Sequence, residues 1–80
     1  MNAVPIVLPD LGSDRCRLSL WLVRTGEVVR EGDRVAEVVF PGAVVDIAAP
    51  ADGVLRDRIA RPGDALAAGQ RLGTIEAAES

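Results

Sequence analysis

The side chains of this chain that could do chemistry are one thiol, twelve carboxylates and nine guanidinium groups. All nine basic residues are arginine, so the chain has no lysine, and it has no histidine. Without histidine there is no imidazole general base, no Ser-His-Asp triad and none of the common zinc sites. Without lysine there is no side-chain amine to join a cofactor through an amide bond, and the always-protonated guanidinium of arginine does not replace it. An independent enzyme is therefore the least favoured interpretation.

The thiol belongs to Cys16, the only cysteine, so an internal disulfide bond is excluded. Arg15 and Arg17 flank it and would stabilise its thiolate form, which leaves a reactive thiol as an alternative. We favour a small, half-buried apolar residue.

The carboxylates are dispersed along the chain and show no clustered spacing of the kind that binds Ca²⁺ or another metal. Several of them adjoin glycines or other turn-forming residues. We expect these side chains to accept hydrogen bonds from nearby backbone amides. They are Asp10, Asp14, Asp33 and Asp64.

Composition describes one globular domain of 80 residues. The hydrophobic fraction is 49%, which is enough for a core, but aromatics make up only 2%, so small and β-branched residues must fill it. The net charge of −3 argues against binding to nucleic acid. No apolar run approaches the ~18 residues of a membrane span. These features predict a soluble, cytoplasmic protein that binds neither membrane nor nucleic acid.

The strongest internal pattern is a repeat, in which residues 22–38 align without gaps on residues 59–75. Apolar positions match across the two copies, as do glycines that lie six residues apart in each copy. The four identical pairs are Arg24/Arg61, Gly26/Gly63, Gly32/Gly69 and Arg34/Arg71.

Each copy predicts strand, turn, short strand, turn and strand, and no segment supports a helix. The turns are centred on Gly26, Gly32, Gly63 and Gly69, and Asp52-Gly53 is a further turn signal. We expect the main strands near Ile6–Leu8, Leu18–Arg24, Val35–Phe40, Val44–Ala48, Val54–Ala60 and Leu72–Glu76, with short strands near Val28–Val29 and Leu66.

Two copies of a sheet-forming unit bury their apolar faces only against each other. The predicted fold is therefore all-β, a flattened barrel-sandwich of two four-stranded antiparallel sheets with a pseudo-twofold axis. The single domain spans residues 1–76, with units at about 1–40 and 43–76 and a tail at 77–80. The connection between the units places a hairpin at one end and both termini at the other.

Four segments, spread in order over the chain, resemble a set of known motifs. Leu8–Gly12 is similar to "MPxLG", Trp21–Asp33 to "WLVKEGDxVxxGD", Pro50–Leu55 to "PxxGxV" and Gly69–Glu76 to "GxxLxxIE". On these segments the whole chain resembles the lipoyl domain of 2-oxo-acid dehydrogenase acyltransferase subunits. Biotinyl carrier domains share the fold, but their Met-Lys-Met signature is no better matched. The resemblance implies the barrel-sandwich fold and membership of a lipoyl/biotinyl carrier family.

The departure from this family is at the hairpin tip, where the lipoyl family has Glu-Thr-Asp-Lys-Ala. This chain has Val39, Phe40, Pro41, Gly42 and Ala43, so Gly42 occupies the acceptor position. Pro-Gly at the two central positions predicts a type II turn that closes the hairpin without a reactive group.

We therefore predict a lipoyl-like domain that has no lipoyl or biotinyl cofactor and acts as a structural or protein-interaction module. Its expected partners are proteins such as components of 2-oxo-acid dehydrogenase complexes. One alternative is a true swinging-arm carrier whose acceptor lysine was removed by engineering. Another is the barrel-sandwich domain of a membrane-fusion-type adaptor, which the short hairpin connection disfavours.

The expected protein-contact site is the hairpin tip, with no catalytic and no metal-binding residues assigned. Phe40 is one of two aromatics, and the pattern leaves open whether it points into the core or outward as an exposed anchor. The second aromatic residue, Trp21, is expected to pack across the sheet with its N–H at the surface. The tip residues are Val39, Phe40, Pro41 and Gly42.

Overall fold

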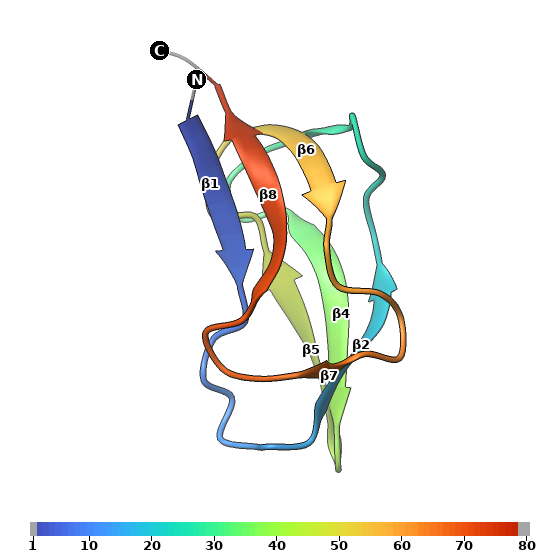
Figure 1. Ribbon diagram of the computed structural model, residues 1–80. Coiled ribbons are helices and arrows are strands. Elements are labelled where there is room, and N and C mark those ends of the chain that lie inside the picture. Colours follow the sequence, from blue (N-terminus) through green and yellow to red (C-terminus); the bar gives the residue numbers. More distant parts are fainter. Residues whose placement is uncertain (1, 79–80) are drawn as a thin grey trace.

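The computed structural model describes residues 2–78, and within them every element is a strand (Figure 1). Two four-stranded antiparallel sheets face each other, with strand orders β1-β8-β6-β3 and β5-β4-β2-β7. The predicted all-β barrel-sandwich is confirmed. The strands are β1 (Asn2–Val7), β2 (Cys16–Trp21), β3 (Val28–Val29), β4 (Arg34–Phe40), β5 (Ala43–Ala48), β6 (Gly53–Arg58), β7 (Ala65–Leu66) and β8 (Arg71–Ala77).

The sequence repeat is a structural repeat. Strands β2, β3 and β4 recur 37 residues later as β6, β7 and β8, with identical lengths, and the two sheet orders interchange when the two halves are exchanged. The β4–β5 hairpin lies at the lower end of the molecule, whereas the start of β1 and the end of β8 lie together at the upper end (Figure 1). Both predictions about the ends are confirmed.

The core lies between the sheets and is built almost entirely from aliphatic side chains, as the low aromatic content requires. Buried positions alternate with exposed ones at the start of β2 and of β6, whereas β4 and β8 also contain consecutive buried residues. Its fully buried members include Ile6, Leu18, Val29, Val35, Val38, Leu55, Leu72 and Ile75.

Four reverse turns separate the short strands from the long ones, and all four have the same hydrogen bonds. In the turn at 61–64, the Asp64 amide donates to the Arg61 carbonyl at 2.9 Å, and the Arg61 amide donates to the Asp64 carboxylate at 2.8 Å. Glu27, Asp33 and Gln70 accept the matching bond in the turns at 24–27, 30–33 and 67–70. The four turns predicted at Gly26, Gly32, Gly63 and Gly69 are confirmed, as is the local backbone bonding of Asp33 and Asp64. The turn expected at Asp52-Gly53 is wrong in part, because Gly53 is the first residue of β6.

The hydrogen bond that the Asp64 carboxylate accepts in the turn at 61–64 should contribute measurably to the stability of the domain. Asp64→Ala should lower the free energy of unfolding by about 1 kcal/mol, because the Arg61 amide loses its intramolecular partner. Asp64→Asn is the matched control, since the Gln70 amide oxygen fills the same role at 2.9 Å. Urea titration followed by circular dichroism measures both. An equal loss in the two variants would show that the charge, and not the hydrogen bond, stabilises the turn.

Several details of the sequence-based description are wrong. Strand β1 spans Asn2–Val7 and does not begin near Ile6. Strand β2 ends at Trp21 and not at Arg24, because the Arg24 amide is bonded to the Glu27 carboxylate and starts a turn. The domain does not end at residue 76, since β8 includes Ala77 and the Ala78 amide donates to the Asp52 carbonyl at 2.9 Å. Residues 79–80 of the expected tail lie outside the described residues.

A further difference concerns the Trp21 indole. Its N–H is not left at the surface but donates to the Ala60 carbonyl at 2.9 Å, because the segment after β6 passes over the ring. The ring also lies over Gly73, where an added Cβ would come within 2.9 Å of the ring edge. Trp21 thus bridges the two sheets.

Candidate protein-contact site at the hairpin tip

The hairpin tip is a two-residue turn between β4 and β5. Phe40 pairs with Ala43, and Pro41 and Gly42 occupy the two central positions. Proline presets the backbone of the first position, and Gly42 adopts φ 84°, the left-handed value that the second position of a type II turn requires. The predicted turn chemistry is confirmed.

No group at the tip fits attachment of a lipoyl or biotinyl arm. Gly42 has no side chain, although a Cβ built there would meet nothing within 4 Å, so the position opens to solvent. An amide-linked arm needs an amine, and no described residue provides one in its side chain. The residues therefore do not fit the cofactor that the resemblance implies.

The nearby thiol does not substitute for the missing amine. The expectation that Cys16 is half-buried is wrong, since it is only 2% exposed. Its side chain points inward at the start of β2, and its Sγ donates to the Ser13 carbonyl at 3.5 Å. Burial between the sheets removes the sulfur from solvent, which disfavours the reactive-thiol alternative.

Phe40 lies between the two orientations that the sequence left open. It is half-buried and packs against the core, but it also lines an open hollow of about 480 Å³ beside the tip. Of the other tip residues, Val39 is half-buried, and Pro41 and Gly42 are exposed. We call this the tip hollow; its lining is Asp14, Arg15, Cys16, Arg17, Val39, Phe40, Pro41 and Ala65.

Sequence reasoning assigned the tip but missed most of the residues beside it. The β1–β2 connection comprises residues 8–15 and the equivalent β5–β6 connection only residues 49–52, so the first unit has four additional residues. Local hydrogen bonds shape the longer connection: the Gly12 amide donates to the Asp10 carboxylate and the Arg15 amide to the Ser13 hydroxyl. The predicted turn role holds for Asp10, whereas Ser13, not Asp14, makes the second bond. An unequal loop length between repeats is the signal that could have identified this segment.

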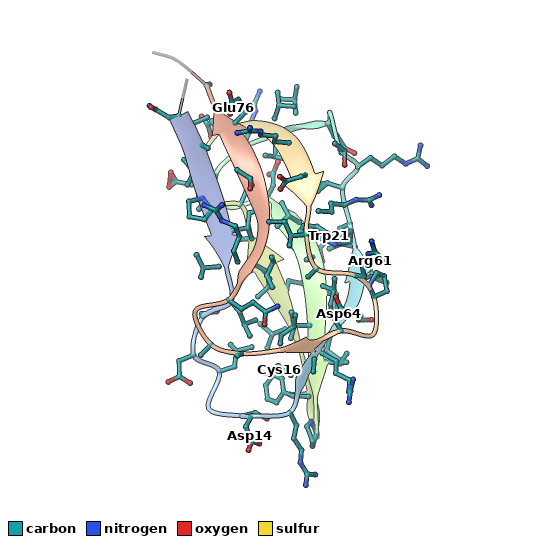
Figure 2. The ribbon with its side chains drawn as sticks, in the orientation of Figure 1. Asp14, Cys16, Trp21, Arg61, Asp64 and Glu76 are labelled. Atoms are coloured by element: carbon teal, nitrogen blue, oxygen red, sulfur yellow. The ribbon has the colours of Figure 1, made fainter. Side chains whose placement is uncertain are left out.

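Arg17 is one of the two arginines that line the tip hollow, and its side chain is exposed. Its Nη1 donates to the Gly63 carbonyl at 2.9 Å, which orients the guanidinium toward the turn at 61–64. Arg15 is exposed at the end of the same segment. Figure 2 shows Asp14 and Cys16 at this lower end of the molecule, with Glu76 at the opposite end. The site therefore combines a half-buried aromatic ring with two guanidinium groups.

The structure brings no other candidate residues together. The turn carboxylates remain distributed over separate turns, and residues 2–78 contain no group of three or more potential ligands that could hold a metal ion. Within the same residues, no helix is long and apolar enough to cross a membrane.

Comparison with known proteins agrees with the fold and with the resemblance. The biotin/lipoyl family model, described as "Biotin-requiring enzyme", matches residues 4–77. The lipoamide acyltransferase component of the branched-chain alpha-keto acid dehydrogenase complex of Pseudomonas putida is 32% identical over 95% of this chain. The dihydrolipoyllysine-residue acetyltransferase component of the pyruvate dehydrogenase complex of Haemophilus influenzae is 27% identical over 91% of it. The chain spans only 18% and 13% of these two relatives.

A solved structure shows the same architecture. The lipoyl domain of the 2-oxoglutarate dehydrogenase complex from Azotobacter vinelandii superposes with a TM-score of 0.73, covering 94% of this chain and 99% of that domain. At 23% identity this likeness supports the fold alone. The family match, the relatives and the repeat-built barrel-sandwich agree: the chain belongs to the biotin/lipoyl family and is a lipoyl-type domain related to the acyltransferase components of 2-oxo-acid dehydrogenase complexes.

Proposed function

We propose that this lipoyl-type domain has no covalently attached cofactor and serves as a structural or protein-interaction module. The observation that supports this most directly is Gly42 in the acceptor position of an intact hairpin. The turn, the pairing of β4 with β5 and the core beneath them remain, while the amine is missing. A domain that has the lipoyl fold but no lysine for cofactor attachment can still function through contacts between its surface and other proteins.

The proposal also covers catalytic activity and cellular location. The chain acts as a non-catalytic domain in the cytoplasm, and its partners are proteins of a 2-oxo-acid dehydrogenase system, which the names of its relatives suggest. The lack of histidine and lysine and the scattered carboxylates support a non-catalytic role. Val39, Phe40, Pro41 and Gly42 form the proposed contact site.

The structure bears differently on the two alternatives. A true carrier whose lysine was removed by engineering is compatible with the open space around Gly42, which would accommodate a long side chain. A membrane-fusion-type adaptor domain is disfavoured, because the connection between β4 and β5 is a two-residue turn and not a long insertion.

Replacing Phe40 tests the contact site. Affinity capture with the wild-type domain should retain 2-oxo-acid dehydrogenase components, identified by mass spectrometry. Phe40→Ser should lose most of that capture, because it removes the only aromatic ring of the tip hollow. Phe40 also packs against the core, so the variant's fold is checked by near-ultraviolet circular dichroism of Trp21.

Val28→Ser is the matched control. Val28 is 73% exposed and lies in β3 at the opposite end of the molecule, where a lost apolar side chain leaves the tip intact. Equal capture by all three proteins, or loss with Val28→Ser alone, would place the contact surface away from the tip.

A further inference from the structure

The pseudo-twofold symmetry provides an internal comparison for the tip hollow. At the other end of the molecule, the equivalent strands form a second open hollow of about 430 Å³, which we call the terminal hollow. The 37-residue offset relates Cys16 to Gly53, Val39 to Glu76 and Ala65 to Val28. The lining of the terminal hollow is Val28, Val29, Arg30, Asp52, Gly53, Val54, Glu76, Ala77 and Ala78.

The backbone is repeated, but the charges are opposite. The tip hollow is lined by two arginines and one aspartate, whereas the terminal hollow is lined by two carboxylates and one arginine. Arg15 and Arg17 have Asp52 and Val54 as their equivalents, so the fold itself does not require arginine at these places. The positive charge at the tip is a property of this end alone.

The apolar part of the two hollows also differs. Phe40 has Ala77 as its equivalent, so only the tip offers an aromatic surface. This ring packs partly against the core, and one hydrogen bond to the Gly63 carbonyl orients the exposed Arg17 guanidinium. Groups that are already ordered lose little conformational entropy when a partner binds.

The two arginines keep free hydrogen-bonding capacity. Within residues 2–78 the ion pairs are Arg34 with Asp46 at 3.3 Å and Arg56 with Glu76 at 3.6 Å, and neither uses Arg15 or Arg17. Of the five guanidinium donors of Arg17, one is bonded to Gly63. The remaining donors are suited to carboxylate oxygens, which a guanidinium binds with two parallel hydrogen bonds.

We propose that the tip hollow binds an acidic, extended segment of a partner protein, whose carboxylates contact Arg15 and Arg17 and whose apolar side chain contacts Phe40. The net charge of −3 repels such a segment from the rest of the domain, so the locally positive hollow directs it to the tip. Asp14 at the rim disfavours a carboxylate beside it and favours contacts nearer Arg17. This inference rests on the proposed interaction role and adds the chemistry of the partner.

The test is a titration of the ¹⁵N-labelled 80-residue chain, followed by two-dimensional NMR, with two synthetic dodecapeptides. One alternates Glu and Leu, and the other alternates Lys and Leu. The acidic peptide should shift the amide signals of residues 14–17 and 39–40, and the basic peptide should leave them in place. Added salt should weaken the acidic complex, because exposed charges are screened.

Charge reversal locates the site. Arg15→Glu/Arg17→Glu should lower the affinity for the acidic peptide by about tenfold or more. Arg30→Glu/Arg58→Glu is the matched control. Both arginines are exposed and lie away from the tip hollow, and their substitution changes the net charge by the same amount as Arg15→Glu/Arg17→Glu. It should bind within about twofold of the wild type, because screening limits distant charges.

Four results would overturn the inference. They are no shift with the acidic peptide, an equal loss in both charge-reversed variants, equal shifts with a thymidine dodecamer, and shifts that grow with protein concentration alone. Equal shifts with the thymidine dodecamer would identify a general site for polyanions. Shifts that grow with protein concentration alone would identify a second copy of the chain as the partner. These outcomes leave the proposed function standing if capture through Phe40 holds. A lipoyl or biotinyl group found on the chain would instead remove the proposed function.

Discussion

Treatment of the purified chain with a lipoate ligase and with a biotin ligase, each with its substrates, is expected to leave the intact mass unchanged. The physical reason is the missing nucleophile: Gly42 has no side chain, the chain has no lysine, and the Cys16 thiol is buried. A lipoyl domain that has its acceptor lysine, included in the same reaction, should be modified completely. Mass spectrometry of the intact protein separates the two outcomes, and a mass increase of one lipoyl or biotinyl group on this chain would refute the proposed function.

The variant Gly42→Lys separates loss of the amine from loss of ligase recognition. Its Cβ has open space, but φ 84° is strained for lysine, so the variant should unfold at lower urea, with a cost of about 1–2 kcal/mol. If the folded variant is modified, the surrounding surface still fits a ligase, and the chain is a close relative of active carriers. If it is not, the surface formed by Phe40 and Pro41 has also diverged.

The largest expected loss of stability comes from Gly53→Ala at the start of β6. A Cβ at this position would collide with the Glu76 carbonyl oxygen of β8, and the pair Gly53↔Ala77 lies at the same place. The obstacle is backbone, so a side-chain rotation cannot relieve it. We expect a cost of about 3 kcal/mol or more. A domain of this length has only about 4–12 kcal/mol in total.

Gly69→Ala is the matched control for this experiment. Its Cβ would meet nothing within 4 Å, and its only cost is the left-handed backbone at φ 82°, about 1–2 kcal/mol. Chemical denaturation monitored by circular dichroism compares the two variants. Equal losses would contradict the close approach of β6 and β8.

The turns and strands could be predicted because their causes are local. Each turn glycine is followed by a residue whose side chain accepts a hydrogen bond from the first amide of the same turn. Each turn is therefore specified by four consecutive residues. The repeat adds a second copy of each turn and strand pattern, so each unit supports the strands predicted for the other. Pro41-Gly42 likewise specified its own turn.

Contacts between distant segments could not be predicted in the same way. Asp52-Gly53 was identified as a turn, yet Gly53 is required because another backbone approaches it. The Trp21 N–H was expected at the surface, because nothing near it in sequence indicates the Ala60 carbonyl. Half-burial of Phe40 comes from its packing against core residues that are distant in sequence.

The sequence by itself determined that this protein is a two-unit β domain of the lipoyl type without a lysine at its hairpin tip. Both statements depend on residue types and short spacings, which act locally. Only the tertiary structure decided that Arg15, Arg17, Phe40 and Ala65 line one hollow, and that the equivalent hollow has the opposite charge. The reason is geometric: these residues belong to three separate segments, which become neighbours only when β4, β2 and β7 pair in one sheet.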